Sequence, residues 1–224
     1  MANRRKVLAA AAVAGTAAAA GGALLVRSAR QADEAYRQAV SGIWRHAQAA
    51  PDDAPDRLRE LVRYGTLAPS SHNTQCWRFR VQDGSVTVLP DLARRCPVVD
   101  PDDHHLHVSV GCAAENMMQA AAALGLRAEG RHLAEAPGSY ALALGLGAIV
   151  RSPLFEAIPR RQTTRGDYDG RPLSAADLAL LEAAGRGQGV RVHLITDRPR
   201  METVLEQVVA ATPRRCGTLP SWRS

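Results

Sequence analysis

The 224-residue chain has only one lysine, Lys6, and only 4% aromatic residues. Its four cysteines, at positions 76, 96, 112 and 216, form no C-x-x-C pair. Their spacing fits neither a zinc site nor the disulfide framework of a small secreted domain, so isolated thiols are expected. Apolar residues still make up 46% of the chain. Because Ala, Leu and Val supply most of them, the composition favours helix-rich packing.

The net charge of +6 does not indicate a nucleic-acid-binding protein. Residues 1–30 hold five basic residues and residues 213–224 hold three, and neither stretch has an acidic residue. The body between them therefore carries a net negative charge. A nucleic-acid-binding face needs positive charge on the folded body, so no nucleic-acid partner is expected.

The N-terminus resembles an export signal. Arg4 and Arg5 precede an uncharged run, rich in Ala and Gly, from residue 7 to residue 26. Paired arginines before a weakly apolar run are typical of a twin-arginine signal, yet this run is also long enough to cross a bilayer about 30 Å thick. We therefore expect an exported (periplasmic or extracytoplasmic) or membrane-anchored protein rather than a cytoplasmic one. Residues 1–29 are expected to lie outside the fold.

Periodicity predicts the elements of the body. Helices are expected at 31–47, 56–66, 106–124, 152–158, 175–184 and 200–211. Strands are expected at 77–81 and 85–89, which form a hairpin around Asp83-Gly84, and at 126–129, 140–150 and 190–195. The predicted fold class is α+β, a mixed and largely antiparallel sheet wrapped by helices around the central helix 106–124. Gly111 is expected to let other helices approach that helix closely, and residues 212–224 are expected to form an unstructured tail.

A histidine cluster near residue 105 suggests a metal site. His104, His105 and His107 follow Asp102 and Asp103 directly. A solvated helix start explains the same residues, because acidic side chains are favoured near the positive end of a helix. No third cluster of ligands occurs elsewhere in the sequence, so no metal site is predicted.

Two polar patterns carry candidate binding residues. Residues 68–77 read Ala-Pro-Ser-Ser-His-Asn-Thr-Gln-Cys-Trp, a loop that can offer N–H groups, hydroxyls and an amide to a planar polar ligand. Composition alone is more typical of a polar turn after a helix. Arg161-x-Thr163-x-Arg165 places two guanidinium groups and a hydroxyl on alternate residues, where they can bind one anion, although charged loops before helices are common.

Both patterns resemble motifs of the nitroreductase-like flavoenzymes. The first is similar to the A-P-S-x-x-N-x-Q-P-W loop of that family, with Cys76 in place of its proline. The second is similar to the R-x-S-x-R segment that opens the family's domains and holds the phosphate of FMN. In that family the arginine segment precedes the loop, whereas here it follows about ninety residues later. This order resembles the Acg-type branch, in which two halves are fused in one chain.

The resemblance implies a division of the chain and a set of FMN-binding residues. Residues 30–158 would form a first half and residues 159–211 an incomplete second half. Arg161, Thr163 and Arg165 would bind the FMN phosphate. The isoalloxazine ring or ribityl chain would be bordered by Pro69, Ser70, Ser71 and Asn73, with Gln75 and Trp77 supporting the loop. No catalytic side chain is implied, because the flavin carries the redox chemistry.

The activity implied by the resemblance is that of an FMN-dependent oxidoreductase. A hydride would pass from NAD(P)H through the flavin to a small nitro or quinone-like acceptor. Two alternatives stay open. Cys76 and the lack of an arginine segment in the first half are typical of a degenerate pocket, as in a non-catalytic flavin-binding or sequestering protein. Residues 213–218 also read as though the reading frame were lost after Ala211, which indicates an inactive, truncated product.

Overall fold

The computed structural model describes residues 27–28, 30–47, 49–187 and 189–216. The export signal or anchor predicted at 7–26 and the end of the predicted tail lie outside these residues. Within the described part of the chain, no helix is long and apolar enough to cross a membrane. The membrane tether through residues 7–26 therefore stays a prediction.

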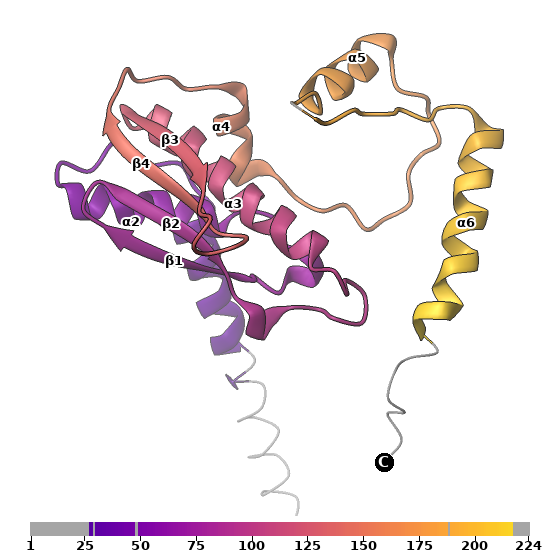
Figure 1. Cartoon of the computed structure of the whole chain (residues 1–224), viewed down its shortest axis with the longest axis horizontal. Coiled ribbons are helices and arrows are strands. Elements are labelled where there is room, and N and C mark those ends of the chain that lie inside the picture. The colour runs from indigo at the N-terminus through magenta and orange to yellow at the C-terminus, as the bar shows by residue number, and fades with distance from the viewer. Residues whose placement is uncertain (1–26, 29, 48, 188, 217–224) are drawn as a thin grey trace, which may run out of the picture.

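A four-stranded antiparallel sheet forms the centre of the body (Figure 1). Its strands are β1 (Trp77–Gln82), β2 (Ser85–Pro90), β3 (Leu126–His132) and β4 (Tyr140–Leu146), in the order β1-β2-β4-β3. The predicted hairpin is confirmed, with Gln82 opposite Ser85 and Gly84 at a positive φ of 65°. The α+β class is confirmed as well, although every pairing in this sheet is antiparallel rather than mixed.

Two helices, α2 (Ala54–Thr66) and α3 (His104–Ala123), pack with this sheet around one core. Helix α3 contacts β2, β3 and β4, and α2 packs against α3. Val86, Val88 and Leu142 are fully buried in the sheet, whereas Arg80 is exposed. Because successive side chains of a strand point to opposite faces, this alternation directs apolar side chains toward the helices. The central helix is thus confirmed, with its N-terminal turn more exposed than predicted.

The close approach of α2 and α3 depends on Gly65 rather than on Gly111. A Cβ atom at Gly65 would lie 3.0 Å from the side chains of both Met117 and Phe79. Such a distance is too short for an ordinary contact. A Cβ atom at Gly111 meets none of the described residues within 4 Å, so the predicted role of Gly111 in helix packing is wrong.

Two further helical segments flank the core. Residues 30–43 are helical, so the helix predicted at 31–47 ends earlier than expected. Helix α4 (Pro153–Ala157) begins at Ser152, whose hydroxyl accepts a hydrogen bond from the N–H of Phe155 at 3.0 Å. Phe155 is only 1% exposed, and it ties α4 to the core.

The remaining elements are α5 (Ala175–Ala184) and α6 (Arg198–Cys216), which stand apart from this body (Figure 1). Helix α5 confirms the helix predicted at 175–184, and the Ser174 hydroxyl caps it by accepting a hydrogen bond from the N–H of Asp177. The strand predicted at 190–195 is wrong, because only an isolated bridge between Gly187 and Val190 forms there. The unstructured tail is wrong over residues 212–216, which continue α6. Nothing in the sequence predicts that continuation, since Pro213 has no backbone N–H to donate.

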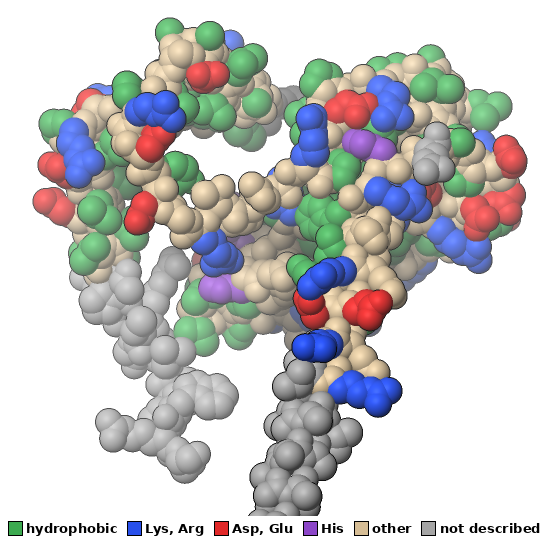
Figure 2. All heavy atoms as spheres, turned by 180° about the vertical axis from the view of Figure 1, so that it is seen from behind, with side chains coloured by type: hydrophobic (Ala, Val, Ile, Leu, Met, Phe, Trp, Pro, Cys, Tyr) green, Lys and Arg blue, Asp and Glu red, His purple; other side chains and the backbone are tan. Residues whose placement is uncertain are grey.

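Helices α5 and α6 expose much of their apolar surface. Helix α5 has no buried residue, and Figure 2 shows apolar side chains among charged ones on this part of the surface. The exposed apolar side chains include Leu180, Leu181, Val204, Leu205 and Val209. The stable core of the described chain therefore lies in the first 160 residues.

We predict opposite effects for two helix-interior glycine substitutions. Gly65→Val should lower the free energy of unfolding by about 1–3 kcal/mol, because the added carbons overpack the contact with Met117 and Phe79. Gly111→Ala should raise it by about 0.5–1 kcal/mol, because alanine is the better helix former and the added carbon has room. Urea unfolding of both variants tests this. Equal effects of the two substitutions would contradict the described packing.

Candidate functional site

The Pro69–Asn73 loop lies between α2 and β1. Hydrogen bonds within the loop hold its shape. The N–H of Gln75 donates to the hydroxyl of Ser70 at 2.9 Å, and the N–H of Asn73 donates to the Ser70 carbonyl at 3.0 Å. Pro69 and Asn73 are exposed, whereas Ser70 and Ser71 are half-buried. The backbone of Gln75 therefore supports the loop, and the hydroxyl of Ser70 is engaged inside the loop.

Three residues of this loop adopt the left-handed backbone conformation. His72, Asn73 and Gln75 have φ values of 50°, 55° and 51°. Asparagine tolerates this region, but for other residues with a Cβ atom it costs about 1–2 kcal/mol. Strained backbone persists where the surrounding contacts determine it, and such residues gather at binding sites. The loop is therefore a candidate binding loop on conformational grounds as well.

Helix α3 anchors the loop through Ser109. The Ser109 hydroxyl accepts a hydrogen bond from the N–H of Ser71 at 3.2 Å and donates one to the carbonyl of His105 at 2.6 Å. The N–H of Ser71 is therefore committed to the protein. The groups of the loop that face solvent include the amide side chain of Asn73.

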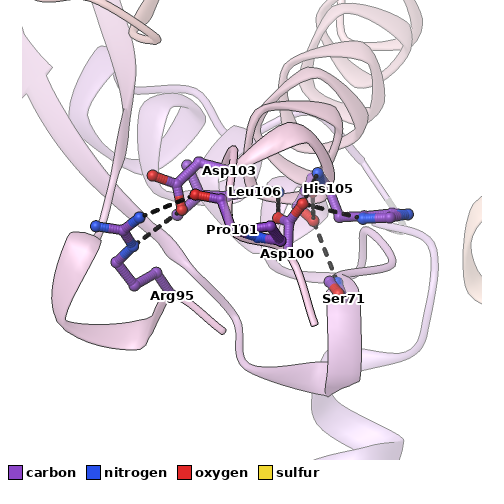
Figure 3. A network of polar contacts seen from close by, with 8 residues as sticks. Ser71, Arg95, Asp100, Pro101, Asp103, His105 and Leu106 are labelled. Atoms are coloured by element: carbon purple, nitrogen blue, oxygen red, sulfur yellow. Dashed lines mark hydrogen bonds and ion pairs between the residues drawn. The ribbon is translucent and has the colours of Figure 1, made fainter. Parts of the chain in front are cut away.

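Asp100 holds the beginning of α3 in place (Figure 3). Its buried carboxylate accepts hydrogen bonds from the N–H groups of His105 and Leu106, both at 3.1 Å, and lies 3.2 Å from Nδ1 of His105. Burial raises the pKa of Asp100, but these donors outweigh that effect and keep the pKa below its usual range. Asp100 thus fixes the first turn of α3, and Ser109 lies one turn further along.

Histidines of the predicted cluster make packing and polar contacts in the first turn of α3. His105 contacts Asp100, while His107 lies against Gly138, where a Cβ atom would come within 2.3 Å of the imidazole ring. Across the residues with described positions, no group of three or more His, Cys, Asp or Glu side chains is arranged to hold a metal ion.

Arg161, the first residue of the arginine pattern, contacts the residue that precedes the loop at 68–77. Its Nη2 atom donates a hydrogen bond to the carbonyl of Leu67 at 3.2 Å. Leu67 is the C-cap of α2, so this cation also lies at the negative end of the helix. The two patterns are 94 residues apart at this contact, and the fold places the arginine next to the residue that precedes the loop.

The segment that contains Arg161 lines an open pocket of ≈ 470 Å³. One wall consists of residues 159–163, which include Arg160, Arg161 and Thr163. The opposite wall consists of Tyr36, Val40 and Trp44. Two guanidinium groups and a hydroxyl beside aromatic rings form a donor set that fits a phosphate monoester. Arg165 is exposed and does not line this pocket.

The sequence-based site lacked several pocket residues, among them Tyr36, Val40, Trp44 and Arg160. For one wall a signal was present, since residues 36, 40 and 44 are spaced four apart along and just beyond the helix at 30–43, and residues four apart lie on one helix face. The charge of Arg161 also affects the thiol of Cys112 in α3. Burial raises the pKa of its thiol, and the positive charge of Arg161 partly offsets that effect. Met117, which also belongs to α3, is fully buried in the core.

Comparison with known proteins finds similarity to two curated relatives from Mycobacterium tuberculosis. They are named "Putative NAD(P)H nitroreductase MT3217" (strain CDC 1551 / Oshkosh) and "Putative NAD(P)H nitroreductase Rv3131" (strain ATCC 25618 / H37Rv). Each is 32% identical over 161 residues, which is 69% of this chain and 46% of the relative. The chain thus spans about half the length of these relatives. No protein-family model matches the chain.

Two solved structures are similar at lower identity. A "putative nitroreductase in complex with fmn" from Desulfovibrio desulfuricans is 21% identical, with a TM-score of 0.35, and the match covers 53% of this chain and 92% of that one. A "Putative NADH Oxidase" from Clostridium acetobutylicum is 14% identical, with a TM-score of 0.35, and covers 59% and 99%.

Asp100 should make the stability of the fold dependent on acid pH. A carboxylate whose folded pKa lies below its unfolded value of about 3.9 stabilises the fold above that pH, and the stabilisation is lost as pH falls through the folded pKa. Asp100→Asn should therefore lose less stability on acidification than the wild type. Urea unfolding at several pH values measures this, with Asp102→Asn as the exposed control. Parallel curves for wild type and Asp100→Asn would contradict the described role.

Backbone strain at Gln75 should be relieved by glycine. Gln75→Gly should raise the free energy of unfolding by about 0.5–1 kcal/mol, because glycine adopts a φ near 51° without a steric penalty. Thr74→Gly is the matched control: the φ of Thr74 is −73°, so glycine there should lower stability. Thermal unfolding measures both variants. A loss of stability in Gln75→Gly as large as that in Thr74→Gly would be inconsistent with strain at residue 75.

Proposed function

We propose that this chain, whose sequence similarity supports a place in the nitroreductase-like superfamily, is an FMN-dependent oxidoreductase. It would carry a hydride from NAD(P)H to a nitro or quinone-like acceptor. Both curated relatives are named as NAD(P)H nitroreductases, which supports the reaction class. The chain covers 46% of their length, so we propose the activity for the site described above.

The contact between Arg161 and Leu67 carries this proposal. Each sequence pattern alone is a weak signal, because polar turns and charged loops are common. Their meeting across 94 residues brings a guanidinium group next to a strained polar loop, which supports one shared site. A ligand with a phosphate at one end and a planar polar ring at the other matches both parts of such a site.

In this proposal the residues of the chain bind and orient the cofactor. Arg160, Arg161 and Thr163 would hold the phosphate in the pocket, and Arg165, which lies outside the pocket, would add positive charge at longer range. The isoalloxazine ring or ribityl chain would lie against Pro69, Ser70, Ser71 and Asn73. When bound, FMN would supply the redox chemistry that links NAD(P)H to the acceptor.

A non-catalytic flavin-binding protein is the second candidate, and the loop itself favours it. The N–H of Ser71 donates to Ser109, and the hydroxyl of Ser70 accepts from Gln75. The N–H of Ser71 is therefore unavailable to a flavin ring in this conformation, and the hydroxyl of Ser70 keeps its O–H to donate but is held within the loop. A ring held by fewer donors could still be bound through its phosphate without being oriented for hydride transfer.

We propose the division into halves, at 30–158 and 159–211, together with the export of the chain. The first range contains the sheet and its packed helices, and most of the second lies apart from them in Figure 1, which supports the division. Export is supported by the paired arginines before residues 7–26.

The purified full chain should bind FMN through Arg161. Titration with FMN, followed by flavin fluorescence, should give saturable binding to the wild type. Arg161→Ala should weaken that binding about 10- to 100-fold, because a charge-assisted hydrogen bond to phosphate contributes about 1.5–3 kcal/mol. Arg186→Ala, which removes an exposed arginine of a surface ion pair outside the pocket, is the matched control and should bind normally.

The same preparations distinguish the two candidates. Oxidation of NAD(P)H with a quinone acceptor by the FMN-loaded chain supports the oxidoreductase. Saturable FMN binding with no NAD(P)H oxidation selects the flavin-binding protein. A chain that takes up no FMN contradicts both.

A further inference from the structure

The wall of the pocket opposite the arginines comes from a segment with no assigned role. Tyr36, Val40 and Trp44 recur every fourth residue along and just beyond the helix at 30–43. Tyr36 is 69% exposed, whereas Val40 and Trp44 are half-buried. An exposed tyrosine on the same helix face as two half-buried apolar residues indicates a wall that is open toward solvent at one end.

Trp44 contacts the guanidinium group of Arg161 directly. The Cζ atom of Arg161 lies 5.7 Å from the centre of the Trp44 ring, within the range of a cation–π interaction. The Leu67 carbonyl accepts a hydrogen bond from Nη2 of the same guanidinium group. The guanidinium group is therefore held by two partners. Because Arg161 lines the pocket and this hydrogen bond uses only Nη2, the donors on Nη1 and Nε can serve a ligand there.

The position of Trp44 is itself fixed by the residues around it. The imidazole of His46 lies 4.6 Å from the ring of Phe155, and the N–H of Ala47 donates to the hydroxyl of Tyr64 at 3.0 Å. The guanidinium group of Arg63 donates to the carbonyl of Ile43. These contacts attach both sides of Trp44 to α2 and α4, which belong to the core. The ring is thus attached to the rigid part of the fold.

We propose that Trp44 is a positioning residue for phosphate binding, and that Tyr36 and Val40 complete the wall of the phosphate pocket. This inference rests on the proposed function. Trp44 holds the guanidinium group of Arg161 toward the pocket, so that its free N–H groups are oriented before the ligand arrives. Preorganised donors bind an anion more tightly than donors that must first be ordered.

The experiment compares FMN with riboflavin, which has the same ring but no phosphate. Kd values for both are measured by flavin fluorescence with the full chain. Trp44→Leu should weaken FMN binding about 5- to 10-fold while riboflavin binding changes less than about twofold, because only FMN uses Arg161. Trp44→Phe keeps an aromatic ring and should restore most of the FMN affinity. Tyr168→Leu removes an exposed aromatic residue outside the pocket, and it should behave like the wild type.

A second variant leaves Trp44 intact, in case Trp44→Leu does not fold. Val40→Asp introduces a negative charge on the wall that faces Arg160 and Arg161. It should weaken FMN binding about tenfold and leave riboflavin binding unchanged, because the carboxylate repels the phosphate and competes for the arginines.

The outcomes separate this inference from the proposed function. A wild-type chain that binds neither flavin overturns both. A wild type that prefers FMN, with the same preference in Trp44→Leu and Val40→Asp, overturns the role of this wall and leaves the proposed function in place. Equal losses for FMN and riboflavin in folded Trp44→Leu overturn the positioning role, since that result indicates a general structural effect.

Discussion

The hydrogen bond from Arg161 to the carbonyl of Leu67 is the interaction on which the site depends. It joins residue 161 to the end of α2 and gives the arginine segment a defined place next to the start of the polar loop. The cation also lies at the C-terminus of that helix, where the helix dipole favours it. Without this contact the two patterns would remain separate surface features of the same chain.

The packing of the core explains why the loop has a single shape. Gly65 lets α2 lie against α3, and Asp100 fixes the first turn of α3. Ser109, one turn further along, then holds the N–H of Ser71. The N–H of Gln75 in turn donates to the hydroxyl of Ser70, so contacts within the fold support the strained backbone at Gln75. The rigidity also limits the loop, because two of its polar groups are already engaged.

Local patterns in the sequence predicted those elements whose formation depends only on neighbouring residues. The Asp83-Gly84 turn and the helix at 175–184 are set by neighbouring residues, and both formed where expected. The strand expected at 190–195 needed a neighbouring strand, which alternation cannot supply. The contacts of Arg161 with Trp44 and with Leu67 depend on how distant segments meet, so the sequence alone could not place them. The resemblance of the two motifs predicted the candidate site but not the wall formed by Tyr36, Val40 and Trp44.

The most direct measurement is amide hydrogen exchange of the full chain with and without FMN. If the loop and the arginine segment form one site, FMN should slow the exchange of amides in residues 68–76 and in residues 160–164 together. The exchange of amides in α6 should not change. Protection of only one of these segments, or of neither, would contradict the central claim that the loop and the arginine segment form one site.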